Sequence, residues 1–231
     1  MFKPCRHTAR VRGRRSSDAS TSASPSPRAR FARGISALDG RARGLLIATT
    51  VALVTLSILI FFFSAEGGDA SSVRSDAIAR VLAPLFAPDI DTWDSLARKA
   101  FISDLRFFVR KAAHATEYAA LGALWFAELH QLARALADDA ARTAACASAR
   151  TMRHARTMRS TLTMRPVHTA ACAFVLTVVY ACTDEFHQLF VGGRAGQATD
   201  VLVDAAGGLV GIAFALACAA LLASRRSRRN V

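Results

Sequence analysis

The chain is short of cysteine and has no closely spaced cysteine pair. Its 231 residues include five cysteines, and none of them belongs to a CxxC motif. Three of the five, Cys172, Cys182 and Cys218, lie inside apolar runs. A disulfide framework or a structural zinc site requires more regular cysteine spacing. These residues are therefore expected to be small apolar packing side chains.

The basic segments are also short of aromatic residues. Lysine and arginine number 30 against 17 acidic residues, which gives a formal charge of +13. The positive charge is concentrated in residues 1–43, 134–166 and 224–231, with long apolar stretches between them. A nucleic-acid-binding domain would present one basic face, often with interleaved aromatic side chains for base stacking. Short arginine-rich blocks between apolar runs are typical of the cytoplasmic loops of membrane proteins, so no nucleic-acid partner is expected.

The first long apolar run predicts a membrane span. Residues 44–63 carry no charge and match the roughly 20 residues that an α-helix needs to cross a membrane. The arginine- and serine-rich leader, residues 1–43, is too polar to bury a core and is predicted to be disordered and cytoplasmic. A cleaved signal peptide is the alternative, but its apolar segment is usually only about 7–15 residues long. An uncleaved first span is therefore favoured.

Residues 64–111 lack the positive bias of a cytoplasmic segment. They carry seven basic and seven acidic side chains, so they are predicted to be extracytoplasmic. A stripe of apolar residues at helical spacing predicts an amphipathic helix that lies in the membrane interface before the second span. The alternative is a small extracytoplasmic helical hairpin packed on itself. The stripe consists of Trp93, Leu96, Phe101, Leu105 and Phe108.

Three further spans complete the predicted architecture. They cover about residues 112–132, 167–183 and 201–223, and the basic segment 134–166 between the first two is predicted to be a cytoplasmic loop. Glu128 and His130 are expected to be solvated at the cytoplasmic end of the second span. The sequence thus predicts an all-α, integral membrane four-helix bundle in the cell membrane. It is multi-pass, with both termini, including the basic tail 224–231, in the cytoplasm.

This topology brings polar residues from three distant segments to the extracytoplasmic ends of the last three spans. Lys111, His114 and Tyr118 are three and four residues apart and share one helical face. Gly207 and Gly211 continue the face of two aspartates in the last span, a pattern that predicts close approach of another helix. Each ionisable residue in the membrane core costs about 2.5–3.5 kcal/mol, so a group of them should be paired, hydrated or functional. The candidate binding residues are Lys111, His114, Glu117, Tyr118, Asp184, Glu185, His187, Gln188, Arg194, Asp200 and Asp204.

Two sequence blocks resemble the VanZ-like family of bacterial membrane proteins. Residues 110–122, RKAAHATEYAALG, resemble the RKxxHxxEYxxLG stretch of that family. Residues 183–194, TDEFHQLFVGGR, together with Asp200 and Asp204, resemble its later DEfHQxFxxgR…DvxxD block. The resemblance covers residues 98–222, and Ala115 departs from it because the family often has an aromatic residue there. It implies a helical membrane protein and a link to low-level teicoplanin resistance, but no reaction.

Several functions remain open for the polar residues. In the favoured one, they bind an envelope lipid, a cell-wall precursor or a glycopeptide, with Arg194 as the fork that holds a phosphate or carboxylate. The alternatives are an enzyme acting on a lipid-linked substrate, a metal site for Zn²⁺ or Mn²⁺, and a salt-bridge network that fixes helix register. The spacing matches no standard metal motif, so neither a metal nor another cofactor is expected. The catalytic or ligating candidates would be His114, Asp184, Glu185 and His187.

Overall fold

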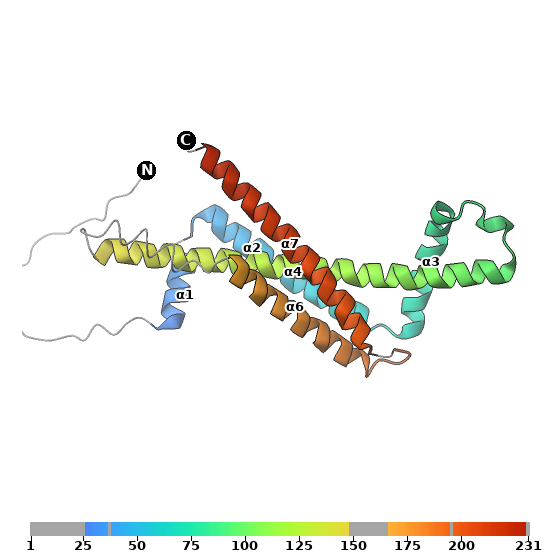
Figure 1. Ribbon diagram of the computed structural model, residues 1–231. Coiled ribbons are helices and arrows are strands. Elements are labelled where there is room, and N and C mark those ends of the chain that lie inside the picture. Colours follow the sequence, from blue (N-terminus) through green and yellow to red (C-terminus); the bar gives the residue numbers. More distant parts are fainter. Residues whose placement is uncertain (1–25, 37, 148–165, 195, 230–231) are drawn as a thin grey trace, which may run out of the picture.

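The described parts of the chain fold mainly into helices. The computed structural model describes residues 26–36, 38–147, 166–194 and 196–229 (Figure 1). All regular secondary structure in these ranges is helical, which confirms the all-α prediction. The elements are α1 (Pro27–Ser36), α2 (Gly40–Ser64), α3 (Gly68–Phe86), the 3₁₀ helix η1 (Ile90–Thr92), α4 (Ser95–Ala147), α6 (Pro166–Gln188) and α7 (Ala198–Arg229).

Three helices are long and apolar enough to cross a membrane. They are α2, α6 and residues Ala198–Arg225 of α7. Most of their large apolar side chains are exposed, among them Ile47, Phe62, Val175 and Phe214. Apolar surface on this scale is rare on soluble monomers and is what a lipid environment requires. The predicted second span, residues 112–132, lies within α4, which is not among these three.

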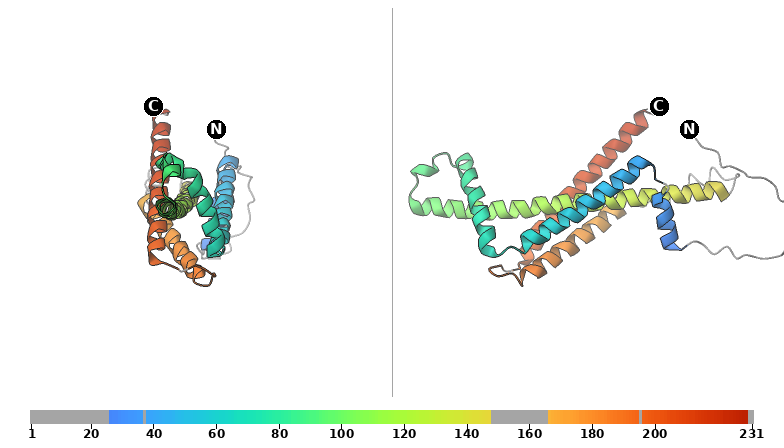
Figure 2. Two further views of the ribbon diagram at one scale, coloured as in Figure 1. Left: turned by 90° about the vertical axis from the view of Figure 1, so that its right-hand side faces the viewer. Right: turned by 180° about the vertical axis from the view of Figure 1, so that it is seen from behind.

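Helix α4 lies at the centre of the molecule. It contacts each of α1, α2, α3, α6 and α7. Seen end-on, α2 and α7 lie on opposite sides of α4 (Figure 2). The two ends of α4 project beyond α2, α6 and α7 in opposite directions, toward α3 at one end and α1 at the other (Figure 1). One helix of 53 residues therefore holds the other elements together.

Helix α2 packs against its neighbours through a narrow stripe. Helix α2 buries Leu46, Leu53 and Ile60, which are seven residues apart. Because two helical turns take about seven residues, such a stripe covers only one edge of a helix. The rest of α2 remains exposed as apolar surface.

The glycine stripe of α7 packs directly against the backbone of α4, as the sequence predicts. A Cβ atom added to Gly207 would lie 2.2 Å from the carbonyl oxygen of Ala115. One added to Gly211 would lie 1.8 Å from the carbonyl oxygen of Ala119. Any side chain at these positions would separate the two helices.

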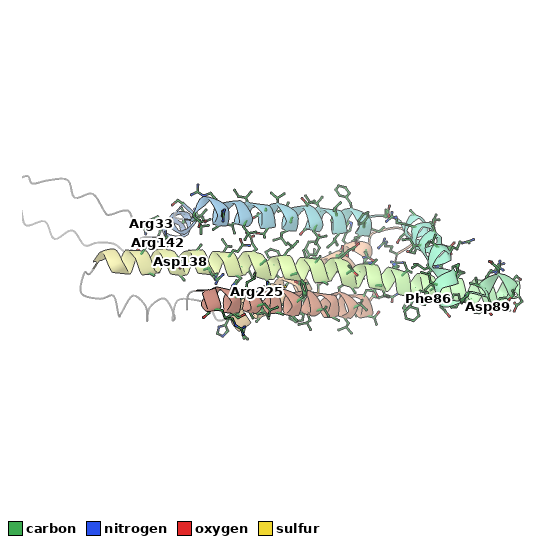
Figure 3. The ribbon with its side chains drawn as sticks, turned by 90° about the horizontal axis from the view of Figure 1, so that it is seen from above. Arg33, Phe86, Asp89, Asp138, Arg142 and Arg225 are labelled. Carbon is green, nitrogen blue, oxygen red and sulfur yellow. The ribbon has the colours of Figure 1, made fainter. Side chains whose placement is uncertain are left out.

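Helix α3, η1 and the start of α4 form a hairpin beyond the spans. Trp93, Phe101 and Leu105 of the predicted apolar stripe pack against small and apolar residues of α3 and η1, whereas Leu96 and Phe108 are exposed. The stripe therefore faces largely α3, as the hairpin alternative requires. Figure 3 labels Phe86 and Asp89 at the tip of this hairpin.

Asp94 caps the N-terminus of α4, at the point where the hairpin turns back. The carboxylate of Asp94 accepts hydrogen bonds from the backbone N–H groups of Leu96 at 2.8 Å and Ala97 at 3.0 Å. These two bonds lower the pKa of Asp94, because they stabilise its ionised form. Asp94 thus fixes where α4 begins.

Two segments predicted to be irregular contain helix. Residues 27–36 of the leader form α1, which packs on α4, where Gly34 lies beside Leu136. Arg33 of α1 and Asp138 and Arg142 of α4 are labelled where these two helices meet (Figure 3). The predicted loop 134–166 begins as a continuation of α4 to Ala147. Packing between α1 and α4 gives order to both segments, while residues 1–25 and 148–165 lie outside the described residues.

Glu128 is buried rather than solvated, contrary to the sequence-based expectation. Its two carboxyl oxygens accept hydrogen bonds from the hydroxyls of Thr49 at 2.6 Å and Thr50 at 2.8 Å. Both threonines belong to α2, so the carboxyl group joins α4 to α2. Hydropathy along α4 did not reveal this contact, because the donors are on another helix.

Candidate functional site

Two polar pairs join α4 to α7. The ammonium group of Lys111 forms an ion pair with the carboxylate of Asp200. One turn further along, Nδ1 of His114 lies 3.6 Å from Oδ1 of Asp204. A step of three residues on α4 therefore matches a step of four residues on α7, which sets the register between these helices.

The second pair is buried and lacks hydrogen bonds. The side chain of Asp204 is fully buried, and neither of its oxygens has a hydrogen-bond partner among the described residues. The same holds for Nδ1 of His114 and for the hydroxyl of the fully buried Tyr118. A buried polar group without a partner costs about 1–3 kcal/mol, and more when it is charged. These atoms have unused capacity to bind water or a polar ligand.

The end of α6 contributes three buried polar residues. Asp184 accepts a hydrogen bond of 3.3 Å from the amide of Gln188, one turn later. Glu185 accepts a bond of 2.9 Å from the backbone N–H of Gln197, which ties the turn before α7 to α6. The second carboxyl oxygen of Glu185 is buried without a hydrogen-bond partner in the described structure. Glu185 therefore positions the turn and still has one free acceptor.

His187 lies outside this group. Its ring stacks on Phe61 of α2, with 4.7 Å between the ring centroids and 30° between their planes. The stacking directs His187 toward α2, while His114 faces α7. The sequence-based grouping of these two histidines is not what the structure shows.

Arg194 is bound to the end of α2. Its Nε donates to the carbonyl oxygen of Glu66 at 2.8 Å, and Nη2 donates to that of Phe63 at 3.0 Å. Carbonyls at a helix C-terminus lack partners within the helix, so this guanidinium caps α2. Burial and then the charge of Arg110 lower the pKa of Arg194, while Asp184 and Glu66 act in the opposite direction. Nη1 is buried without a hydrogen-bond partner in the described part of the chain, and Nη2 has a second N–H that these bonds do not use.

A cavity of about 220 Å³ connects several of these residues. It lies between the ends of α2 and α6, the start of α3 and the polar segment of α4. Three guanidinium groups line it together with an imidazole and two carboxyl groups. These residues are Arg74, Arg110, Arg194, His114, Glu117 and Asp184.

Sequence reasoning missed part of this lining. Arg74 forms an ion pair with Glu66 and lies over the ring of Phe63, 5.3 Å from its centroid. Both charged residues belong to a segment of balanced charge without a motif. Arg110 was part of the recognised block but was not among the expected binding residues. Of these residues, only Arg110 could have been identified from the sequence, because it directly precedes Lys111 in the recognised block.

The catalytic and metal alternatives find little support in this arrangement. Thr183 is the hydroxyl residue next to the motif, but it is exposed and donates to the carbonyl of Val179 at 2.8 Å. Within the described residues, no three His, Cys, Asp or Glu side chains are placed to hold one metal ion. Two of the four residues suggested as ligands contact different helices, His114 through Asp204 of α7 and His187 through Phe61 of α2.

Comparison with known proteins gives one match. A family model described as VanZ/LLP1 matches residues 49–221, about three quarters of the chain. The match begins within α2 and ends within α7, so it includes the hairpin, the central helix and the cavity. No curated protein and no solved structure matches the chain.

Proposed function

The chain belongs to the VanZ/LLP1 family, and on this basis we propose that it is a multi-pass bacterial membrane protein that binds an anionic envelope component. The ligand would be the headgroup of an envelope lipid or a cell-wall intermediate, held without chemical turnover. Its binding would contribute to tolerance of glycopeptides such as teicoplanin.

The proposed topology has four spans, with both termini in the cytoplasm. The central part of α4 is the fourth span, beside the three apolar helices. The exposed apolar side chains of α2, α6 and α7 support a lipid environment. The arginine-rich leader and the tail, with Arg225, Arg226, Arg228 and Arg229, support the cytoplasmic assignment. The cavity and the hairpin are then extracytoplasmic.

The observation that carries the binding proposal is the set of buried polar atoms without partners. Asp204, His114, Tyr118, Glu185 and Arg194 each present at least one such atom at the same end of the molecule. Native structures contain few of these groups, and each one calls for an explanation. A salt-bridge network would explain the pair of Lys111 and Asp200, but it does not explain donors and acceptors that have no partner. Of these residues, His114 and Arg194 line the cavity, where a polar ligand would satisfy them, and ordered water would satisfy the others.

The cavity also indicates the class of ligand. Three guanidinium groups favour a phosphate or carboxylate, and the two carboxyl groups would accept hydrogen bonds from hydroxyl or amide groups. Drug-sized ligands occupy pockets of about 300–1,000 Å³, whereas this cavity measures about 220 Å³. It is therefore suited to a headgroup, and a whole glycopeptide would not fit inside it.

The proposal can be tested by complementation. A deletion strain would receive the wild type, Glu117→Gln, Asp184→Asn or Arg110→Gln, and teicoplanin and vancomycin susceptibility would be measured at matched membrane abundance. These cavity variants should fail to restore tolerance. Asp104→Asn and Arg225→Gln are matched controls, because they remove the same charges at exposed positions outside the cavity, and they should complement. Full complementation by the cavity variants would contradict the proposal.

A further inference from the structure

A second concave site lies on the hairpin, separate from the cavity. A groove of about 770 Å³ runs between α3 and the first turns of α4, with η1 at its end. It shares no lining residue with the cavity. Six charged residues line it: Asp76, Arg80, Asp91, Arg98, Lys99 and Arg106.

The groove has a fixed shape because an apolar core and one arginine brace it. Ala83 and Ile90 are buried against α4 and also line the groove. The guanidinium of Arg98 donates to the backbone carbonyls of Ile90 at 3.1 Å and Asp91 at 2.7 Å. Arg98 therefore holds η1 against α4 and closes one end of the groove.

The groove carries an excess of positive charge. Its two carboxylates are already paired, Asp76 with Arg80 at 2.9 Å and Asp91 with Arg98 at 3.5 Å. Lys99 and Arg106 have no ion-pair partner in the described part of the chain. They are seven residues apart on α4, about two turns, so both point to the same side of the helix. Two positive charges are thus left to attract an anion in a concave site.

The exposed surface of the hairpin connects the groove to the membrane. On α3, Val73, Val81 and Leu85 are exposed at intervals that are multiples of four residues, so they form one apolar stripe. This stripe begins at Val73, ten residues after the exposed apolar end of α2 at Phe62 and Phe63. An apolar stripe next to a basic groove is the pattern of a surface that lies on a bilayer with its charges at headgroup level.

We propose that the groove between α3 and α4 binds the phosphate group of an anionic phospholipid, with Lys99 and Arg106 as its direct cationic contacts. Arg98 positions η1, and Trp93 in the groove wall lies against the glycerol region of the lipid. The residues of the groove differ from those of the cavity, so binding here is separate from ligand binding there, but its place at the outer leaflet rests on the proposed topology. The hairpin would then be anchored to the outer leaflet beside the spans.

The test uses Trp93 as a reporter. The full chain has two tryptophans, and Trp125→Phe leaves Trp93 alone. In detergent, this protein would be titrated with dihexanoyl phosphatidylglycerol, dihexanoyl phosphatidylcholine or inorganic phosphate, and Trp93 fluorescence would be recorded. We expect a saturable change with phosphatidylglycerol at the lowest concentration. Lys99→Gln with Arg106→Gln should raise the half-saturating concentration about tenfold or more, as expected when about 1.4 kcal/mol is lost.

Control variants and ligands make each outcome decisive. Arg225→Gln with Arg228→Gln removes the same charge from exposed positions on α7 and should leave the titration unchanged. An equal response to phosphatidylcholine would mean apolar partitioning only, and an equal response to inorganic phosphate would mean a free-anion site. Either result, or an unchanged titration of the Lys99 and Arg106 variant, would overturn the proposal. Far-UV circular dichroism would verify that the variants remain helical.

Discussion

At the residue level, Arg194 combines a structural role with a proposed ligand contact. Two of its five N–H donors are used by the carbonyl oxygens of Phe63 and Glu66 at the end of α2, which leaves both hydrogens of Nη1 and one of Nη2 for a ligand. The fork expected from the sequence needs two parallel donors directed at one anion, and Nη1 together with the second N–H of Nη2 can provide them. Arg110, which lines the same cavity, can contribute a further contact.

The first prediction concerns this capping role. Arg194→Lys should lower the stability of the protein in detergent by about 1–3 kcal/mol without any ligand, because one ammonium group cannot reach both carbonyls and hydrogen bonds of charged groups are worth that much. Thermal unfolding followed by circular dichroism would measure the loss. Arg225→Lys is the matched control at an exposed site. If both variants unfold at the wild-type temperature, Arg194 does not act as a cap.

The polar residues show what helical spacing can and cannot predict. Spacing placed Lys111 and His114 on one face of α4, and Asp200 and Asp204 lie opposite them. Periodicity defines a face within one helix, but it does not identify the neighbour that meets this face. His187 stacks on Phe61 from a helix more than a hundred residues earlier, and this contact depends on the tertiary arrangement alone.

At the element level, Glu128 connects α4 to α2 through a contact whose two sides are unequal. The threonine hydroxyls have a second acceptor, whereas the carboxyl group depends on the hydroxyls. The hydroxyls of Thr49 and Thr50 also lie within hydrogen-bond distance of the carbonyl of Leu46 in their own helix, at 3.0 and 2.8 Å. If the carboxyl group is removed, both threonines still have an acceptor. If the hydroxyls are removed, the buried carboxyl group loses both threonine donors.

The second prediction follows from this asymmetry. Thr49→Val with Thr50→Val should destabilise the protein by about 3 kcal/mol or more, since a buried acidic group is left without these partners. Glu128→Gln alone should cost about 1 kcal/mol, the value of one ordinary hydrogen bond. Adding Glu128→Gln to the double valine variant should restore part of the loss, as measured by unfolding in detergent. Equal effects of the two changes would contradict this account of the contact.

The third prediction concerns the packing of α7 on α4. Gly211→Ala should destabilise the protein by about 1–3 kcal/mol, because the new methyl group overlaps the backbone of Ala119. Gly44→Ala is the matched control, since a Cβ atom at Gly44 meets no atom within 4 Å. Alanine there should be neutral or stabilising by up to about 1 kcal/mol through helix propensity. Similar unfolding temperatures for the two variants would contradict the close packing at Gly211.

The helices themselves were predictable to different degrees. Hydropathy predicts α2, α6 and α7, because each contains a long run with few charges. It is less effective for α4, whose centre contains polar residues that are satisfied or paired only by neighbouring helices. The continuation of α4 to Ala147 and the formation of α1 also depend on their mutual packing, which a window of local sequence does not contain.

At the level of the whole molecule, the two ends of the long helices differ in charge. The start of α2 and the end of α7 lie at one end, and the turns from α2 to α3 and from α6 to α7 lie at the other (Figure 2). The described residues at the first end include Arg33, Arg41, Arg43 and Arg225, whereas residues 64–111 beyond the second end have no net charge. The positive-inside rule predicts that the first end is cytoplasmic, and the proposed topology then places the cavity and the groove outside.

The fourth prediction tests this orientation. Gly192 is exposed in the turn between α6 and α7, and a Cβ atom added there meets no atom within 4 Å, so Gly192→Cys should not disturb the fold. In a version without the five native cysteines, this residue should react with a membrane-impermeant maleimide on intact cells. Ser227→Cys, at the exposed end of α7, should react only after lysis. The reverse pattern would place the cavity and the hairpin in the cytoplasm, and an extracytoplasmic ligand would then have no access to either site.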